Sequence, residues 1–181
     1  MTDLPHAPRR QSPWSIPIRF EDVPETGRHV DLQADEHTRA ELAHFVSVQV
    51  VASAAASFDV SRHGRDGLRV TGEVRARVGQ ICVVTLEPLE SEIVEAVDVV
   101  FRPTGEPNSD GEDAEEDEDE PEPLVDGMAD LGALATEFLI LGIDPYPRKP
   151  GAVFESPAAG NPQDGPFAAL AKLKGGGGER K

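Results

Sequence analysis

The stretch that decides the fold is "SVQVVASAAASFDV" (residues 47–60), followed after a short turn by "LRVTGEVRARVG" (residues 68–79). In both stretches apolar side chains alternate with polar ones, which is the period of a strand with one buried face. The apolar positions are even-numbered: Val48, Val50, Ala52, Ala54, Ala56, Phe58 and Val60 in the first, and Leu68, Val70, Val74, Ala76 and Val78 in the second. The glycine-containing turn at residues 61–67 therefore predicts a long β-hairpin.

Shorter strand patterns lie on both sides of this hairpin. Residues 14–23 ("WSIPIRFEDV") alternate in the same way. Because proline cannot donate to a strand ladder, either this strand lies at a sheet edge or the position of Pro17 faces solvent. Residues 29–34 ("HVDLQA") predict a second short strand. Residues 91–103 ("SEIVEAVDVVFRP") predict another strand, after a corner at "TLEPLE" (residues 85–90).

Two segments have the signature of helices. Asp35 is placed as the N-cap of a helix over "DEHTRAELAHFV" (residues 35–46), and Asp130 as the N-cap of a second helix that ends at Gly142. The expected buried stripe of the second helix comprises Leu131, Leu134, Phe138 and Leu141. The fold class is therefore α+β, a curved antiparallel β-sheet packed by two helices.

The charge of the chain is strongly acidic and unevenly distributed. The 181 residues carry 34 acidic and 17 basic side chains, for a net charge of −17. Residues 109–123 ("SDGEDAEEDEDEPEP") have no basic and almost no apolar side chain, so we expect residues 104–123 to be a disordered acidic insertion. It interrupts a domain spanning residues 13–154. Residues 1–12 are predicted to be a disordered arm, and residues 155–181 a flexible tail with a short amphipathic segment.

The acidic insertion limits the choice of partners. A dense polyanion is repelled by DNA and by anionic membranes and attracts basic proteins or cations. The candidate contacts for a basic partner are Glu115, Glu116, Asp117, Glu118, Asp119 and Glu120. The alternative is a solvated loop without a partner. No run of about 18 apolar residues is present to span a membrane, and a cytoplasmic location is expected.

The only cysteine lies in "CVVTLEP" (residues 82–88). A reactive thiolate needs a nearby base or a helix N-terminus, and a structural zinc ion needs three or four thiolate or imidazole ligands. The neighbours of Cys82 supply neither, so a buried core position is the preferred interpretation. Motifs for catalysis, phosphate binding or a cofactor are also missing, so we expect no catalytic, metal or cofactor site and no enzymatic activity.

One basic feature lies within the predicted fold. Arg69, Arg75 and Arg77 fall on the solvent side of the second hairpin strand, where they are candidates for contact with RNA phosphates. The alternative is an ordinary solvated face, because Glu73 interrupts the arginines and no aromatic residue lies between them.

"CVVTLEP", a strand ending in "VFRP" (residues 100–103), an acidic insertion and "LVDGMADLGALATEFLILGIDPYPRKP" (residues 124–150) together resemble the YceD family of bacteria and plastids. The resemblance extends over residues 14–174. Its members are described as large ribosomal RNA subunit accumulation proteins. The motif residues here are Cys82, Leu86, Glu87, Pro88, Asp130, Leu131 and Glu137, which the resemblance implies to be structural or partner-facing. Many members carry a second cysteine where this chain has Thr85, so a zinc or redox role is not carried over.

The resemblance implies a non-enzymatic factor in large-subunit biogenesis that supports accumulation or processing of 23S ribosomal RNA. The implied partners are the pre-ribosomal large subunit, ribosomal RNA or a basic ribosomal protein. The net charge of −17 favours the protein partner over RNA. The alternative function is an RNA-processing enzyme, or a subunit of one, whose site the sequence does not reveal.

Overall fold

The computed structural model describes residues 12–103 and 121–154. The expected N-terminal arm except Ser12, most of the acidic insertion and the C-terminal tail with its amphipathic segment lie outside these residues. The chain divides into two compact units, Met1–Lys149 and Pro150–Lys181. All the helices and strands below belong to the first unit.

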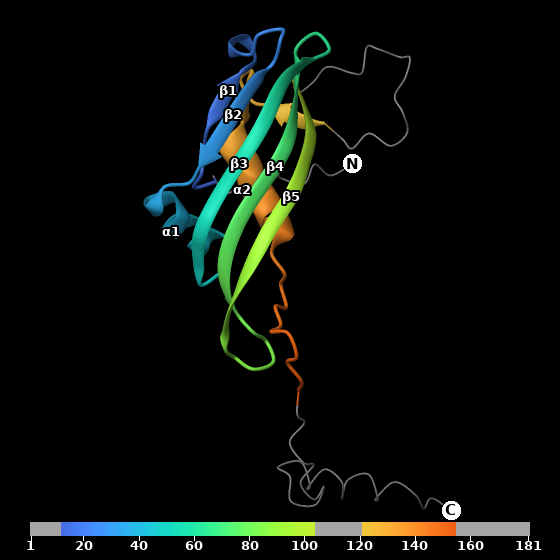
Figure 1. Cartoon of the computed structure of the whole chain (residues 1–181). Coiled ribbons are helices and arrows are strands. Elements are labelled where there is room, and N and C mark those ends of the chain that lie inside the picture. The colour runs from blue at the N-terminus through green and yellow to red at the C-terminus, as the bar shows by residue number, and fades with distance from the viewer. Residues whose placement is uncertain (1–11, 104–120, 155–181) are drawn as a thin grey trace, which may run out of the picture. The chain divides into compact units, whose positions relative to one another are not determined.

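The central element is a five-stranded sheet with the order β2-β3-β4-β5-β6 (Figure 1). Its strands are β2 (Arg28–Gln33), β3 (Val50–His63), β4 (Gly67–Ile81), β5 (Pro88–Pro103) and β6 (Glu122–Leu124). The pairs from β2 to β5 are antiparallel, and the short β6 joins the end of β5 in parallel. A separate two-stranded sheet pairs β1 (Pro17–Arg19) with β7 (Met128–Asp130), and a single 3-10 turn, η1 (Phe20–Asp22), follows β1.

Two helices pack against this sheet. Helix α1 (Glu36–Phe45) contacts β3, whereas α2 (Leu131–Gly142) contacts β4 and β5 and crosses behind them in Figure 1. Each helix begins at its predicted N-cap. The Asp35 carboxylate accepts a hydrogen bond from the Thr38 N–H, and the Asp130 carboxylate accepts from the Gly132 and Ala133 N–H groups. The predicted α+β class is therefore confirmed.

The core lies between the inner face of the sheet and α2. The even-numbered residues of β4 from Val70 to Val78, except Gly72, are buried there, as are Phe58 of β3 and Leu139 of α2. The alternation predicted from residues 68–79 is confirmed, because one face of the hairpin is buried and the other solvated.

The predicted alternation of buried and exposed residues fails at the start of β3. The sequence placed Val50 and Ala52 on the buried side, but both are exposed and Val51 is buried instead. The pairing of β3 with β4 shifts register between Val51 and Ser53, as a β-bulge does, and an extra residue in one strand exchanges the two faces.

Three further expectations were wrong in detail. The strand expected over residues 14–23 is only Pro17–Arg19, and η1 follows it at once. Leu141, expected in the buried stripe of α2, is 74% exposed. The acidic insertion was expected to reach residue 123, but Glu122 and Pro123 belong to β6, where they pair with Phe101 and Arg102.

Candidate functional site

The turn between β4 and β5 is built around the buried Cys82 side chain. The Cys82 N–H donates to the Glu87 carbonyl at 2.9 Å, and the Leu86 N–H donates to the Cys82 carbonyl at 2.9 Å. The sulfur itself accepts hydrogen bonds from the backbone N–H groups of Thr85 and Lys149, both at 3.4 Å. Cys82 is fully buried, in agreement with its expected core position.

These donors change the acidity of the thiol. A hydrogen bond from the Thr85 side chain, followed by the backbone N–H groups of Lys149 and Thr85, lowers the pKa of Cys82 from 9.0 to about 6, although desolvation opposes the shift. The sequence indicated that no base or helix N-terminus lies near this cysteine. The Thr85 hydroxyl and backbone N–H groups supply the stabilisation instead, which a local sequence pattern does not reveal.

Lys149 also fixes the outside of the same turn. Its Nζ atom donates to the Glu87 carboxylate at 3.0 Å, and this contact lowers the pKa of Glu87. The Pro147 carbonyl accepts from the Val83 N–H at 2.9 Å, so the segment after α2 lies along the turn. Leu86 at its tip has a φ of 59° and is 77% exposed. A left-handed leucine is uncommon, and the surrounding hydrogen bonds hold it in place.

The second group of motif residues forms the start of α2. Besides its two cap bonds, Asp130 accepts from the Ile16 N–H at 2.8 Å and from the Ser15 hydroxyl at 2.6 Å. Leu131 is buried in the core. The carboxylate of Asp130 therefore has a structural role, because it joins the first strand to the helix.

Glu137 lies on the exposed face of α2, away from the core. A shallow hollow of about 360 Å³ brings it together with Asp130, Met128 and Pro17. The structure thus brings together Asp130 and Glu137 at one place and Cys82, Leu86, Glu87 and Pro88 at another. It does not place the two groups in one site.

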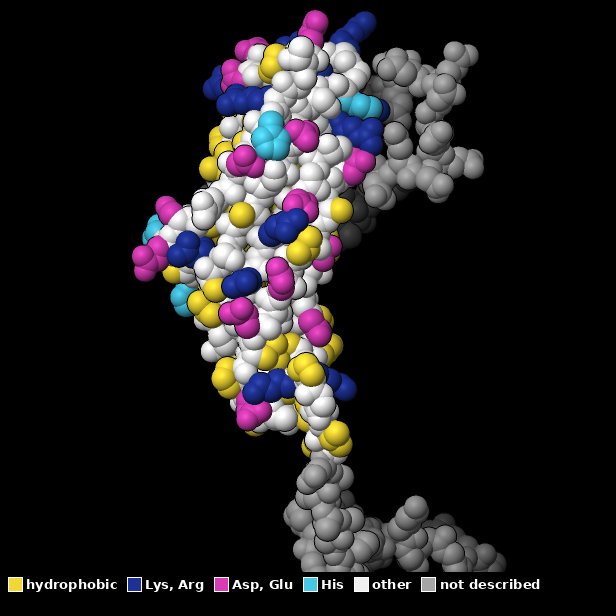
Figure 2. Space-filling model, in the orientation of Figure 1, with side chains coloured by type: hydrophobic (Ala, Val, Ile, Leu, Met, Phe, Trp, Pro, Cys, Tyr) yellow, Lys and Arg dark blue, Asp and Glu magenta, His cyan; other side chains and the backbone are white. Residues whose placement is uncertain are grey.

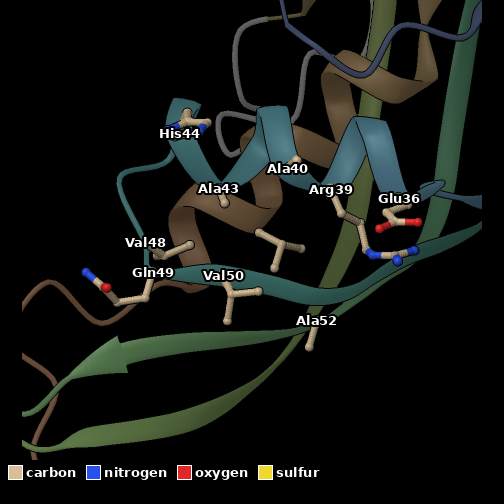
Figure 3. Close-up of a pocket in the computed structure, with 10 residues that line it drawn as sticks. Glu36, Arg39, Ala40, Ala43, His44, Val48, Gln49, Val50 and Ala52 are labelled. Atoms are coloured by element: carbon tan, nitrogen blue, oxygen red, sulfur yellow. The ribbon is translucent and has the colours of Figure 1, made fainter.

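A second hollow, of about 420 Å³, lies between α1 and the bulged start of β3 (Figure 3). Glu36 and Arg39 lie at one end and His44 at the other, with Ala40 and Ala43 between them. The Arg39 guanidinium already donates to the Ala34 carbonyl at 2.9 Å. This hollow is therefore a gap over small side chains and holds no converging set of titratable groups.

The three candidate arginines do lie on the outer face of β4, as expected. Arg69 donates to both oxygens of Asp98 at 2.8 and 2.6 Å, and Arg75 donates to Glu73 at 2.6 Å. These contacts lower the pKa of Asp98 and of Glu73 and raise that of Arg75. Figure 2 shows Lys and Arg side chains interleaved with Asp and Glu over this face. RNA contact here stays a prediction, and the paired carboxylates weigh against it.

The candidate contacts for a basic partner, residues 115–120, lie outside the described residues. Within residues 12–103 and 121–154, three His, Cys, Asp or Glu side chains nowhere gather closely enough to hold a metal ion. In the same ranges no helix has both the length and the apolar character needed to cross a membrane.

The fold defines an acidic α+β domain. Its motif residues form two separate structural features, the turn between β4 and β5 and the start of α2. The family model of YceD, described as "Large ribosomal RNA subunit accumulation protein YceD", matches residues 70–174. This match spans more than half of the chain, which therefore belongs to the YceD family, as the resemblance indicated. Comparison with curated proteins and with solved structures gives no match.

Sequence reasoning missed Thr85 and Lys149 as partners of Cys82. Thr85 was noted only as the replacement for a second cysteine. Lys149 lies 67 residues further along the chain, and only the fold brings it to the turn. A basic residue shortly after the second helix was the one available signal, and it does not identify a partner.

Proposed function

We propose that this protein is a non-enzymatic factor in biogenesis of the large ribosomal subunit, and that it supports accumulation or processing of 23S ribosomal RNA by binding a basic ribosomal protein. Membership of the YceD family supports the ribosomal role. A cytoplasmic location follows from that role.

The observation that favours a protein partner over RNA is the charge of the folded surface. By its register the outer face of the sheet carries Asp31, Asp59, Glu73, Glu90, Glu92 and Asp98 against Arg69, Arg75 and Arg77. The whole chain has a net charge of −17. Such a surface repels phosphates and attracts polycations, and ribosomal proteins are strongly basic. The alternative of an RNA-processing enzyme or subunit has no supporting observation among the described residues.

The proposal is tested with two purified ligands. One is total protein stripped from large ribosomal subunits and freed of RNA, and the other is 23S ribosomal RNA freed of protein. The full chain should retain individual ribosomal proteins at low salt and leave the RNA unbound. Retention of the RNA alone would overturn the choice of partner. In cells, depletion of the protein should lower 23S relative to 16S ribosomal RNA, and an unchanged ratio would overturn the ribosomal role.

A further inference from the structure

Strand β5 has one long unpaired edge. Strand β4 pairs with it from Pro88 to Phe101, whereas on the other side β6 pairs only with Phe101–Pro103. Among the described strands, none pairs with this outer edge from residue 88 to residue 100. Figure 1 shows β5 as the last long strand at that side of the sheet. Such an edge presents a row of N–H and C=O groups on which another strand can pair.

The hydrogen-bond alternation identifies the groups that face outward. In antiparallel pairs the residues that exchange hydrogen bonds with the neighbour occur at every second position. The Cys82 N–H donates to the Glu87 carbonyl, and the register continues from Ile81 opposite Pro88. The odd-numbered residues of β5 therefore bond to β4. The even-numbered residues from Glu90 to Val100 direct their N–H and C=O groups to the open edge.

The same even-numbered residues place their side chains on the outer face, and their charge is one-sided. Glu90 and Glu92 are exposed there, Val94 is 51% exposed, and Asp98 completes the row. The stretch "PLESEIVEAVDVV" (residues 88–100) has no Lys, Arg or His. An added strand would therefore meet the Glu90 and Glu92 carboxylates toward one end, an apolar side chain in the middle, and Asp98, already paired with Arg69, toward the other end.

This pattern disfavours a second copy of the chain as the added strand. In a two-fold antiparallel pairing centred on Val94, Glu90 would lie opposite Asp98 of the second copy. Centred on Glu92, the same pairing would place that carboxylate opposite itself. Like charges directly opposite each other destabilise a strand pair, whereas opposite charges stabilise it. The edge therefore suits a strand with basic side chains.

We propose that the open edge of β5, from Glu90 to Val100, binds an extended basic segment of a partner protein as an added antiparallel strand. Backbone hydrogen bonds to the even-numbered residues supply affinity. Lys or Arg at alternate positions of the partner lies opposite Glu90 and Glu92, and an apolar residue lies near Val94. This inference rests on the proposed function and names the surface that would carry it.

The test uses the full chain and a capped lysine–valine peptide, in which lysines at two alternate positions face Glu90 and Glu92, a valine at the next alternate position faces Val94, and valines lie between them. Amide hydrogen exchange is followed by NMR with and without the peptide. The peptide should slow exchange at Glu90, Glu92, Val94 and Ala96 about tenfold or more. A peptide N-methylated at the residues that would donate to β5 keeps its charge and loses those donors, so it should give no such protection. Equal effects of the two peptides, or none at these amides, would overturn the edge proposal.

Charge reversal supplies a second test. Glu90→Lys with Glu92→Lys should weaken binding of the lysine–valine peptide about tenfold at low salt, since two attractive cross-strand pairs become repulsive. Glu21→Lys with Glu25→Lys makes the same change of net charge before β2, at the opposite side of the sheet, and should leave the affinity nearly unchanged. Equal losses in both variants would show that only net charge matters and would overturn the edge proposal.

The two proposals fail in different ways. If basic ribosomal proteins bind the full chain but neither the amides of β5 nor the Glu90 and Glu92 variant respond, the edge proposal fails and the proposed function stands. If no basic ribosomal protein binds the unaltered chain at low salt, the proposed function fails together with the inference that rests on it.

Discussion

The Asp130 carboxylate accepts a hydrogen bond from the backbone N–H of Ile16 at 2.8 Å, although the two residues lie 114 positions apart. The same oxygen, Oδ1, caps α2 through the Gly132 and Ala133 N–H groups, both at 3.0 Å. The Leu131 N–H in turn donates to the Ile16 carbonyl at 3.0 Å. One carboxylate thus joins the first strand of the chain to the helix that closes the core.

Replacing Asp130 by alanine removes the cap and the anchor of β1 together. An N-cap substitution alone costs about 0.5–2 kcal/mol, so we expect Asp130→Ala to lower the free energy of unfolding by about 2 kcal/mol or more. Asp130→Asn keeps an acceptor oxygen and should lose less. Urea unfolding measures both, with the exposed Glu25→Ala as the control. A loss no larger than that of Glu25→Ala would contradict the structural role.

Gly72 in the middle of β4 is the position at which the hairpin least tolerates a side chain. Its φ is 150°, and an added Cβ would clash with the backbone oxygen of Ser57 on β3. Gly72→Ala should therefore lower the free energy of unfolding by about 2–4 kcal/mol. Gly64→Ala is the matched control, because Gly64 also has a positive φ, 62°, but no atom within 4 Å of an added Cβ. Equal losses in urea unfolding would show that the clash is relieved without cost.

The Cys82 thiol should make stability depend on pH. Because its pKa is about 6 in the folded protein and 9.0 in an exposed thiol, the folded state favours the thiolate. The contribution to the free energy of unfolding is therefore complete above pH 9, falls as the pH decreases, and is absent below about pH 6. Urea unfolding across this range should show the trend in the unaltered chain, and Cys82→Ala should abolish this part of it.

Thr85→Val tests what lowers the pKa of Cys82 while leaving the thiol itself in place. It removes the side-chain hydrogen bond that contributes most to lowering the pKa of Cys82, so the pKa should rise toward its usual value. Ultraviolet absorbance of the thiolate during a pH titration measures it directly. Thr71→Val on the outer face of β4 should leave the titration unchanged. A Cys82 pKa that is the same in Thr85→Val and in the unaltered chain would show that the hydroxyl does not stabilise the thiolate.

The ion pairs on the outer face change the expected salt dependence of RNA binding from the one based on sequence alone. Each phosphate contact adds about 0.9 to the slope of log affinity against log salt for a duplex and about 0.7 for a single strand. Three free arginines would give up to three contacts, but Asp98 and Glu73 already pair with Arg69 and Arg75. Replacing Arg69, Arg75 and Arg77 together by serine should therefore reduce the slope by about one contact or less. A loss near three contacts would show that RNA displaces the carboxylates.

The matched variant for that measurement is Asp98→Asn with Glu73→Gln. It removes the carboxylate partners of Arg69 and Arg75 while leaving the arginines in place, so RNA affinity at low salt should increase. No increase would show that these arginines do not contact RNA in either state.

The sequence predicted the elements whose signals are local. Alternation over residues 68–79 gave the buried face of β4, and Asp35 and Asp130 gave both helix starts. The sequence-based prediction of burial failed where a single position depends on its tertiary packing. The bulge at Ala52 exchanges the faces of Val50 and Val51, and nothing in the alanine-rich run marks it. Leu141 lies in the helical stripe that the sequence predicted to be buried, but it is exposed, and the next residue, Gly142, is the one that packs against Ile93 and Glu95 of β5.

In the candidate sites, too, the sequence predicted what depends on local residues and missed what depends on the fold. The burial of Cys82 was expected because its sequence neighbours supply neither a base nor a set of metal ligands, whereas its hydrogen bond from Lys149 depends on the path of the chain after α2. The open edge of β5 was also not evident from the sequence. The acidic residues from Glu90 to Asp98 are visible there, but only the strand order shows that they line an unpaired edge.

The last prediction concerns the acidic run, whose residues 110–120 lie outside the described residues. Ten carboxylates between Asp110 and Glu122 without a compensating base create a field that accelerates encounter with a polycation. Because solvated charges are screened within about 8 Å at physiological salt, this effect should be strong at low salt and small at about 0.15 M. Deleting residues 110–120, which spares Glu122 and therefore β6, should lower the association rate for a basic ribosomal protein far more than it raises the dissociation rate. Stopped-flow measurements at several salt concentrations separate the two rates. Equal association rates at low salt would leave recognition to the folded surface alone.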